Sequence, residues 1–310
     1  MRILILGGAG FIGSHLVSLL DNNNEHELIV LDNLSSGSRK NIPPTVKFYQ
    51  MDIRDNDLDK IFEEHRFDVV VNLAAQTMVP YSLEHPDEDA NINILGLINV
   101  LNCCRKHSVQ RVIFSSSAAV YGNNKNVPLK ENETSMPTSF YGITKMTAEH
   151  YMRVYNELYG IDAIVLRFAN VYGERQGNGG EGGVISIFAK RIASGLPISL
   201  FGDGEQTRDF VYAGDIAEAI AAALDFKGYH ILNVSNANEV SINQLIENFA
   251  QVARKKIKVE YKEARPGDIY RSCLDNSCLK KELGILPQTT LQEGLLKTYD
   301  YFAELAREDN

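Results

Sequence analysis

The sequence predicts an α/β fold in which a doubly wound parallel sheet is followed by a smaller, mixed C-terminal domain. Strand-like and helix-like patterns alternate through the first half of the chain, as they do where crossover helices join parallel strands. The run Val69–Ala74 is apolar nearly throughout, which is typical of a strand that helices cover on both faces. A glycine-rich turn at Gly7–Gly13 separates the first strand pattern from the first helical pattern.

Each predicted element of the first half rests on its hydrophobic pattern. The strands are Arg2–Gly7, Leu28–Asp32, Val46–Asp52, Val69–Ala74, Val112–Ser117 and Ala163–Phe168. The helices are Phe11–Leu20, Leu58–His65, Asp87–His107 and Tyr141–Tyr159. Small or polar residues stand at the strand ends, namely Gly7, Asp32, Asp52, Ala74, Ser117 and Asn170. Open α/β sheets bind ligands outside the carboxyl ends of their strands, so these positions predict one long groove.

The pattern becomes less regular after residue 170. Gly173–Gly183 is rich in glycine and is predicted to be a loop. Shorter elements follow, namely helices at 184–194, 214–224, 241–253 and 291–305 and strands at 198–201 and 230–234. We expect a first domain over residues 1–170 and a second over 171–310, and the pattern leaves open whether 214–234 returns to the first sheet.

Composition narrows the possible partners. The formal net charge of −9 disfavours nucleic acid, which attracts concentrated positive charge. The 4 cysteines form no C-x-x-C pair and no histidine cluster has metal-ligand spacing, so we expect reduced thiols and no metal site. No stretch reaches the roughly 18 apolar residues of a transmembrane helix. We therefore expect a cytoplasmic protein that binds neither a membrane nor nucleic acid.

The glycine loop and an acid after the second strand predict a dinucleotide site. Gly7, Gly10 and Gly13 permit a tight turn, and the helix N-terminus behind them offers free N–H groups to a pyrophosphate. Asp32 follows about 20 residues later, where a carboxylate accepts a hydrogen bond from a ribose 2′-hydroxyl and repels a 2′-phosphate. This favours NAD over NADP. The alternative for Asp32 is an ordinary turn residue before Asn33.

A second constellation combines Tyr141 and Lys145 with Ser115–Ser117 at the end of the fifth strand. Residues at i and i+4 share one helix face. A tyrosine pKa of about 10 is too high for a base at neutral pH, but a neighbouring ammonium favours the phenolate. The pair can then remove a proton from a sugar hydroxyl while a serine bonds to the reacting oxygen. An isolated Y-x-x-x-K is more often an ordinary amphipathic helix, so the prediction depends on the glycine loop and Asp32.

Further motifs extend over essentially the whole chain. They are GGAGFIG at Gly7–Gly13, Asp32-Asn33, Asp52-Ile53, LAAQ at Leu73–Gln76, SSSAAVYG at Ser115–Gly122, YGITK at Tyr141–Lys145, LRFANVYG at Leu166–Gly173, GDGEQTRDFV at Gly202–Val211 and RPGD at Arg265–Asp268. With them the chain resembles the extended short-chain dehydrogenases/reductases, within these the nucleotide-sugar epimerases and dehydratases, and most of all the UDP-glucose 4-epimerases. The resemblance implies a Rossmann domain with NAD as cofactor. It also implies 4-epimerisation of a UDP-hexose (UDP-glucose or UDP-galactose, with the N-acetyl forms left open) through a 4-keto intermediate.

The resemblance assigns roles by position. Ser117 would orient the sugar hydroxyl, Tyr141 would be the catalytic base, and Lys145 would bind the nicotinamide ribose and lower the Tyr141 pKa. The implied cofactor-binding residues are Gly7, Gly10, Phe11, Ile12, Gly13, Asp32, Asn33, Asp52, Ile53, Leu73, Ala74, Ala75, Gln76, Tyr141, Lys145 and Phe168. The implied substrate-binding residues are Ser117, Tyr141, Asn170, Val184, Phe201, Arg208, Arg265, Asp268 and Ser272. A homodimer built on the helices near 87–107 and 141–159 is also implied.

Positions at which the chain departs from the family pattern favour some reactions of the family over others. Dehydratases carry an Asp-Glu pair just after the strand-five hydroxyl, and Ala118 and Ala119 stand there instead, which disfavours a 4,6-dehydratase. Ala169 stands where many UDP-glucose 4-epimerases have a bulkier aromatic, and Ser272 leaves room for an N-acetyl group at the sugar C2. The alternatives are a dehydratase or another nucleotide-sugar enzyme and, outside catalysis, an NAD-sensing protein. A sensor would have no need of the Ser-Tyr-Lys set.

Overall fold

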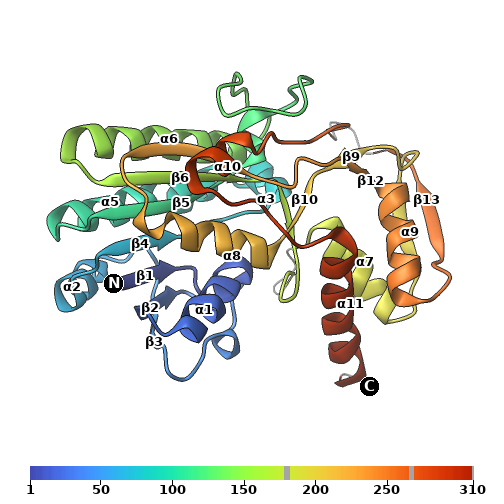
Figure 1. Cartoon of the computed structure of the whole chain (residues 1–310), viewed down its shortest axis with the longest axis horizontal. Helices are drawn as coiled ribbons and strands as arrows, with labels where there is room; N and C mark the ends of the chain where they lie inside the picture. The colour runs from blue at the N-terminus through green and yellow to red at the C-terminus, as the bar shows by residue number, and fades with distance from the viewer. Residues whose placement is uncertain (178–181, 265–268, 309–310) are drawn as a thin grey trace.

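The computed structural model describes residues 1–177, 182–264 and 269–308. Arg265 and Asp268, two of the predicted substrate residues, lie outside the described residues, as does part of the predicted loop Gly173–Gly183. Figure 1 shows a broad sheet flanked by helices and, beside it, a smaller group of elements that includes the C-terminal helix.

A seven-stranded sheet forms the larger part, in the order β11-β6-β5-β4-β1-β2-β3. Its strands are β1 (Arg2–Leu6), β2 (Glu27–Asp32), β3 (Lys47–Gln50), β4 (Val69–Asn72), β5 (Arg111–Ser117), β6 (Asp162–Phe168) and β11 (Tyr229–Val234). All neighbouring strands run parallel. The order steps outward from β1 in both directions, which confirms the predicted doubly wound parallel sheet.

Alternate residues of the strands enter two separate cores. Ile3 and Ile5 of β1 belong to one buried cluster, whereas Leu4 and Leu6 belong to the other. Side chains alternate across a strand, so a strand that is apolar throughout is buried on both faces. One face of the sheet is covered by α1 (Phe11–Asn23) and α8 (Ala213–Ala222). The other is covered by α2 (Leu58–His65), α5 (Gly96–Lys106) and α6 (Phe140–Tyr159).

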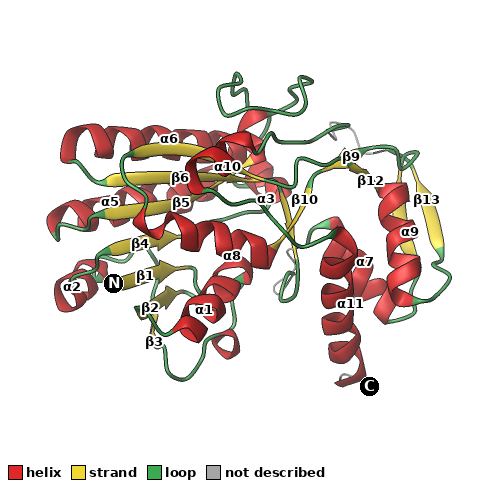
Figure 2. Cartoon of the chain, in the orientation of Figure 1, coloured by secondary structure: helices red, strands yellow, loops and turns green. Residues whose placement is uncertain are grey.

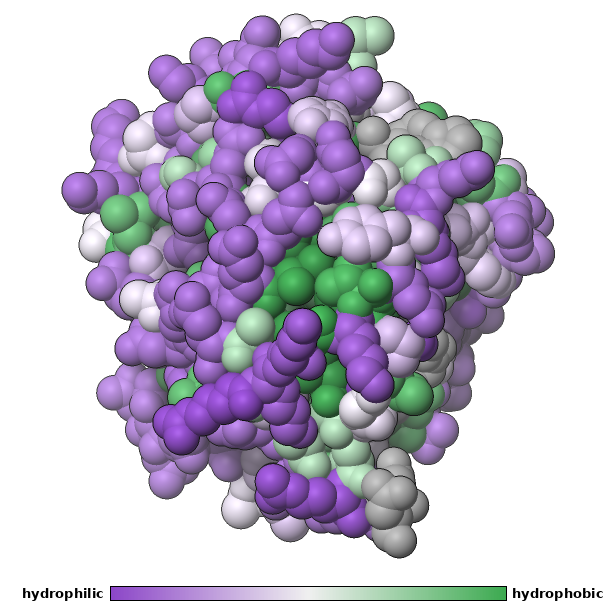
Figure 3. All heavy atoms as spheres, turned by 90° about the vertical axis from the view of Figure 1, so that its right-hand side faces the viewer, coloured by the Kyte–Doolittle hydropathy of each residue, from purple (hydrophilic) through white to green (hydrophobic). Residues whose placement is uncertain are grey.

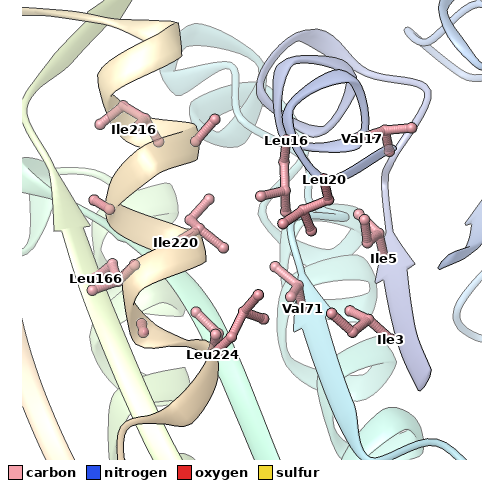
Figure 4. Packing of buried hydrophobic residues seen from close by; sticks show 14 of the residues in the cluster. Ile3, Ile5, Leu16, Val17, Leu20, Val71, Leu166, Ile216, Ile220 and Leu224 are labelled. Carbon is pink, nitrogen blue, oxygen red and sulfur yellow. The ribbon is translucent and has the colours of Figure 1, made fainter. Parts of the chain in front are cut away.

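The segment 213–234 packs on this sheet. Figure 4 shows Leu16 and Leu20 of α1 and Ile220 of α8 directed into one shared core beside Val71 of β4. Burial of each such side chain contributes about 1.5–3 kcal/mol, so the contact fixes α8 against α1. β11 then pairs in parallel with β6 and extends the sheet.

The predicted helix 87–107 is interrupted in the structure. The chain forms α3 (Val79–Glu84), α4 (Pro86–Ala90), a π-helical turn at Asn91–Leu95, and only then α5. Pro86 lies in the first turn of α4, where a missing N–H leaves no helical bond unmade. In the π-helical turn, the Asn93 side chain exchanges hydrogen bonds with the backbone of Gln76. Such turns are often found at functional sites.

The smaller part consists of short paired strands and three longer helices. β7 (Asn170–Tyr172) pairs with β10 (Phe210–Tyr212), β9 (Thr207–Arg208) with β12 (Val240–Ser241), and β8 (Ile198–Phe201) with β13 (Val259–Lys262). The helices α7 (Val184–Ala193), α9 (Ile242–Ala253) and α11 (Leu291–Glu308) enclose a third buried cluster that includes Phe188, Phe249 and Phe302. The short helix α10 (Ser277–Leu283) packs beside β11.

Loops occupy much of the path between these C-terminal elements, as Figure 2 shows. Figure 3 shows the outer side of this part, where hydrophobic atoms gather in a hollow between polar side chains. Within the described ranges, no helix is long and apolar enough to cross a bilayer.

Candidate functional site

The loop between β1 and α1 is shaped by glycines that other residues could not replace without a clash. Gly7 has a φ of +74°, and a Cβ on it would lie 2.7 Å from the backbone nitrogen of Ala74. A Cβ on Gly13 would lie 2.3 Å from the carbonyl oxygen of Gly7. Gly10, the N-cap of α1, offers no capping side chain, so the first N–H groups of the helix are left for an anion. This cradle suits a phosphate group.

A cavity of about 400 Å³ extends from this loop across the carboxyl ends of the central strands. Every residue that the sequence assigned to the cofactor lines it, namely Gly7, Gly10, Phe11, Ile12, Gly13, Asp32, Asn33, Asp52, Ile53, Leu73, Ala74, Ala75, Gln76, Tyr141, Lys145 and Phe168. The strand order reverses between β1 and β4, and open α/β sheets bind ligands at such a switch point. The structure thus gathers these residues around one ligand-sized space.

Asp32 lies at the end of β2 with its side chain mostly buried. Its Oδ2 accepts the N–H of Ala9 at 3.0 Å, and its Oδ1 accepts the N–H of Leu34 at 2.7 Å. Burial raises the pKa of this carboxyl above its ordinary value, and the main-chain donors oppose the rise. The carboxylate therefore braces the glycine loop while it lines the cavity.

Asp52, just beyond β3, accepts hydrogen bonds from the side chains of Arg54 and Asn33. The Arg54 guanidinium binds it through Nε–Oδ1 and Nη2–Oδ2 contacts of 2.8 Å each, and Asn33 Nδ2 donates to Oδ2 at 2.8 Å. Hydrogen bonding to Arg54 holds the pKa of Asp52 well below its usual range. Arg54 also lines the cavity, and the sequence analysis missed it. Its position two residues after Asp52 is the signal that could have identified it.

Two hydroxyls fix the start of α6, the helix that carries Tyr141 and Lys145. Ser139 is the N-cap and accepts the N–H of Gly142 at 3.1 Å. Ser82 of α3 accepts the N–H of Tyr141 itself at 3.2 Å. These N–H groups have no partner within the helix, so the two caps determine where Tyr141 stands at the cavity.

Lys145 is buried, with 2% of its surface exposed. Its ammonium donates to the carbonyl oxygen of Ser115 at 2.8 Å and lies 4.8 Å from the centre of the Phe114 ring. It lies 5.8 Å from the centre of the Tyr141 ring, one helical turn away. Burial lowers the pKa of Lys145 to about 8. A partly desolvated cation next to a phenol at a cavity wall can stabilise the phenolate.

The serines at the end of β5 take different positions. Ser115 and Ser116 line the cavity, whereas Ser117 is not among the described residues that do so. The Ser117 Oγ accepts the N–H of Ala119 at 3.2 Å and caps the short 3-10 helix after β5. A hydroxyl that accepts one hydrogen bond can still donate another, so this contact leaves Ser117 able to bind a ligand oxygen.

Of the predicted substrate residues, Ser117 and Tyr141 belong to β5 and α6, and five others lie at the smaller part of the molecule. Asn170 begins β7, Val184 begins α7, Phe201 ends β8, Arg208 ends β9, and Ser272 precedes the buried Cys273. Among the residues described, none of them lines the 400 Å³ cavity. The structure therefore places these five apart from the cofactor cavity, with Tyr141 as the residue shared by both predicted sets, and leaves Arg265 and Asp268 outside its described ranges.

Asp209 is a residue whose role the sequence did not suggest. It is fully buried between β9 and β10, directly after Arg208. Its carbonyl accepts the N–H of Asn170 at 2.9 Å, and its Oδ2 accepts the N–H of Leu274 at 3.2 Å. Burial raises the pKa of Asp209 to about 7, and the main-chain donors oppose the rise. One side chain thus ties the strand after Arg208 to the segment that carries Ser272.

Comparison with known proteins gives consistent matches over nearly the whole chain. A model of the NAD dependent epimerase/dehydratase family matches residues 3–235. A putative UDP-glucose 4-epimerase of Methanocaldococcus jannaschii is 43% identical over 302 residues, which cover 96% of this chain and 97% of that protein.

Two solved structures are similar in fold as well. A UDP-glucose 4-epimerase from Thermotoga maritima, crystallised with UDP-glucose, has a TM-score of 0.95 and 40% identity and covers 98% of this chain and 99% of its own. A UDP-N-acetylglucosamine 4-epimerase from Methanobrevibacter ruminantium, in complex with UDP-N-acetylmuramic acid, has a TM-score of 0.92 and 36% identity and covers 98% of each chain.

Proposed function

Since this chain belongs to the NAD-dependent epimerase/dehydratase family, we propose that it catalyses the 4-epimerisation of a UDP-hexose, with UDP-glucose and UDP-galactose as the substrate pair. It is an NAD-dependent nucleotide-sugar epimerase. One observation carries the proposed reaction. The buried Lys145 and Tyr141 line the same cavity as the glycine cradle, so a proton acceptor stands where a bound dinucleotide and a sugar would meet.

The residues around the cavity fit NAD. The Gly7–Gly13 loop would hold the pyrophosphate, Asp32 the adenosine ribose, Asp52 and Ile53 the adenine, and Lys145 the nicotinamide ribose. The glycine cradle supports this placement, because added Cβ atoms would clash with the backbone and open the tight turn that would hold a phosphate. When bound, NAD would supply the acceptor for the hydride that leaves the sugar C4 and would be the source from which that hydride returns to the 4-keto carbon.

In the proposed mechanism, the Tyr141 phenolate takes the proton of the sugar 4-hydroxyl. The Lys145 ammonium stabilises the phenolate, and Ser117 donates a hydrogen bond to the reacting oxygen. The 4-keto sugar then presents its opposite face, and Tyr141 returns the proton to the oxygen. Proton transfer by a positioned side chain of this kind contributes roughly 10²–10⁴-fold to a rate. Ala118 and Ala119 supply no acid or base for loss of water, which favours epimerisation over dehydration.

The nucleotide would be held by the smaller part of the molecule. Arg208 and Arg265 are the proposed partners of the UDP diphosphate, because a guanidinium binds phosphate oxygens in two-point contacts. Asn170, Val184, Phe201, Asp268 and Ser272 complete the proposed set. Firm contacts to the nucleotide and few to the hexose would let the keto sugar turn over without leaving.

Incubation of purified protein with UDP-glucose and with UDP-galactose, in separate reactions resolved by chromatography, tests the proposal. The same equilibrium mixture is expected from either side. Tyr141→Phe should lower kcat by roughly 10²–10⁴-fold and keep its NAD, because only the proton acceptor is lost. Tyr261→Phe, at an exposed position of β13, is the control and should keep full activity.

Wild-type protein that interconverts neither this pair nor its N-acetyl counterparts would overturn the function. Full activity of Tyr141→Phe would overturn the mechanism.

The C2 substituent of the hexose is the next question. The similar epimerases act, by their names, on UDP-glucose and on UDP-N-acetylglucosamine. Ser272 has a small side chain, which supports acceptance of the N-acetyl sugar beside the unmodified one. Parallel assays with UDP-glucose and UDP-N-acetylglucosamine measure the two kcat/KM values. Comparable values are expected, and Ser272→Tyr should reduce turnover of the N-acetyl sugar selectively.

The proposed assembly is a cytoplasmic homodimer built on α5 and α6. Leu95, Leu158 and Tyr159 support this surface, since they are 58%, 67% and 45% exposed although each is largely apolar. Leu101, in contrast, is buried in the core and takes no part. Light scattering should give twice the chain mass for the wild type and a smaller value for Leu158→Glu. Cell fractionation tests the location.

A further inference from the structure

Asp89 of α4 is a fully buried acid that the proposed mechanism does not use. Its Oδ1 accepts hydrogen bonds from Gln76 Nε2 at 2.6 Å and from Asn93 Nδ2 at 3.2 Å. Its Oδ2 accepts the Thr144 hydroxyl at 2.8 Å. These partners come from three separate stretches of chain and are all neutral. Hydrogen bonding satisfies the carboxylate oxygens, but no charge on these partners balances the acid.

The partners of Asp89 lie on the walls of the active site. Gln76 lines the proposed cofactor cavity, and its backbone N–H and carbonyl are both bonded to the side chain of Asn93, at 2.9 and 3.0 Å. Thr144 stands next to Lys145 on α6, and its hydroxyl lies 3.0 Å from the carbonyl oxygen of Tyr141. Asp89 therefore joins the cofactor wall to the turn of helix that holds the proposed base.

Asp89 also affects the charge of Lys145, as the groups around the lysine ammonium indicate. The groups around its ammonium are Asp89 from α4, Tyr141 and Glu149 from its own helix, and the Phe114 ring and Ser115 carbonyl from β5. Glu149 is bound at two points by Arg167, so its charge is already balanced. Within the described part of the chain, the hydrogen-bond partners of the Asp89 side chain include no cation. Both acids raise the Lys145 pKa against the effect of burial, Asp89 more than Glu149, and Asp89 is the one whose charge no hydrogen-bonded cation offsets.

We propose that Asp89 is a positioning residue that supplies the counter-charge of Lys145 and fixes the cofactor wall at Gln76 to the catalytic helix. The proposal rests on the proposed function, because it concerns the same proton transfer. Without Asp89, the ammonium would lose its proton at lower pH, and Tyr141 would lose its fixed distance from the cofactor wall.

The test compares pH profiles of kcat for the full-length holoenzyme. Asp89→Asn keeps the shape of the side chain and removes its charge. The Lys145 ammonium should then lose its proton at lower pH, so the alkaline limb of the profile, where kcat falls, should move to lower pH by about one unit. Asp87→Asn removes a charge from an exposed position on the same short helix and should leave the limb in place. Thr144→Ala removes one hydrogen bond of Asp89 and no charge, so it should lower kcat and leave the limb in place.

Each outcome bears on one claim. An inactive wild type overturns the proposed function and this inference with it. An active wild type with an unmoved limb in Asp89→Asn overturns the inference alone. If Asp89→Asn does not fold, Thr144→Ala and Asp89→Glu carry the test, because both keep the charge and disturb the geometry. Unchanged kcat in both variants, or a shifted limb in either, then overturns the inference.

Discussion

The Glu149 carboxylate and the Arg167 guanidinium form a two-point ion pair inside the protein, with Nε–Oε1 at 2.9 Å and Nη2–Oε2 at 2.6 Å. Both side chains are about 5% exposed. The Ser116 hydroxyl donates to the same carboxylate at 2.5 Å, and Arg167 also donates to the Tyr121 hydroxyl at 2.9 Å. Glu149 lies one turn beyond Lys145 on α6, so the pair fixes the catalytic helix against β5 and β6.

Arg167→Met should destabilise the protein strongly, because it leaves the Glu149 charge buried without its cation. The expected loss of unfolding free energy is about 3–5 kcal/mol. The double variant Glu149→Leu/Arg167→Met removes both charges and should recover most of that loss, since a buried ion pair adds little over packed apolar side chains. Urea unfolding measures both values. A loss below about 1 kcal/mol in the single variant, the range of exposed ion pairs, would contradict this account.

Gly13→Ala should weaken retention of NAD. The new Cβ would lie 2.3 Å from the Gly7 carbonyl oxygen, so the turn that cradles the pyrophosphate would have to open. We expect NAD affinity to fall by at least about tenfold, or 1.4 kcal/mol. Chromatography of the nucleotide released on denaturation measures the cofactor content. The control is Gly160→Ala at the C-cap of α6, where φ is +68° but a Cβ would meet nothing within 4 Å, so it carries the strain of a left-handed alanine without a clash in the cradle. Equal NAD content in both variants would refute the assigned role of the glycine cradle.

Asp32→Asn should relax the preference for NAD over NADP. The carboxylate at the end of β2 lines the cavity and would repel a 2′-phosphate, while the amide would not. We expect the ratio of the two dissociation constants to move toward NADP by about tenfold. Calorimetric titration of protein freed of its cofactor measures both constants. An unchanged ratio of the two dissociation constants would mean that a residue other than Asp32 distinguishes the 2′-hydroxyl from the 2′-phosphate.

Asp209→Asn should change how stability depends on pH. Burial raises the pKa of Asp209 from 3.8 to about 7 in the folded protein, so between these values the folded state binds the proton that the unfolded state has released. Wild-type stability therefore falls relative to Asp209→Asn as pH rises through this window, by about 4 kcal/mol in total.

Urea unfolding of the two proteins across the same pH range measures this difference. The matched control is Asp203→Asn, which replaces an exposed acid in the preceding turn. Its unfolding free energy should change with pH in the same way as that of the wild type. A difference between wild type and Asp209→Asn that stays constant with pH would contradict the expected titration.

The lining of the cofactor cavity could be predicted from the sequence because the signals for it are local. The glycine spacing, the acid after β2 and the apolar strand runs each lie within a few adjacent residues, and their geometry follows from backbone sterics and side-chain alternation. The helix at 87–107 was predicted as one element because its hydrophobic pattern continues through Asn93. In the structure a π-helical turn interrupts it, and Asn93 within that turn bonds to the distant Gln76, a contact that the local pattern does not contain.

The sequence by itself determined the doubly wound sheet, the glycine cradle and the Tyr141–Lys145 pair, because each depends on residues that are neighbours along the chain. Tertiary structure alone decided which hydrogen-bond donors the buried acids find. Asp89 reaches Thr144 across 55 positions, and Asp209 reaches Leu274 across 65. A carboxylate must find donors when it leaves water, and those donors come from whichever elements the fold packs against it. No local pattern encodes that choice, which is why these acids became visible only in the folded molecule.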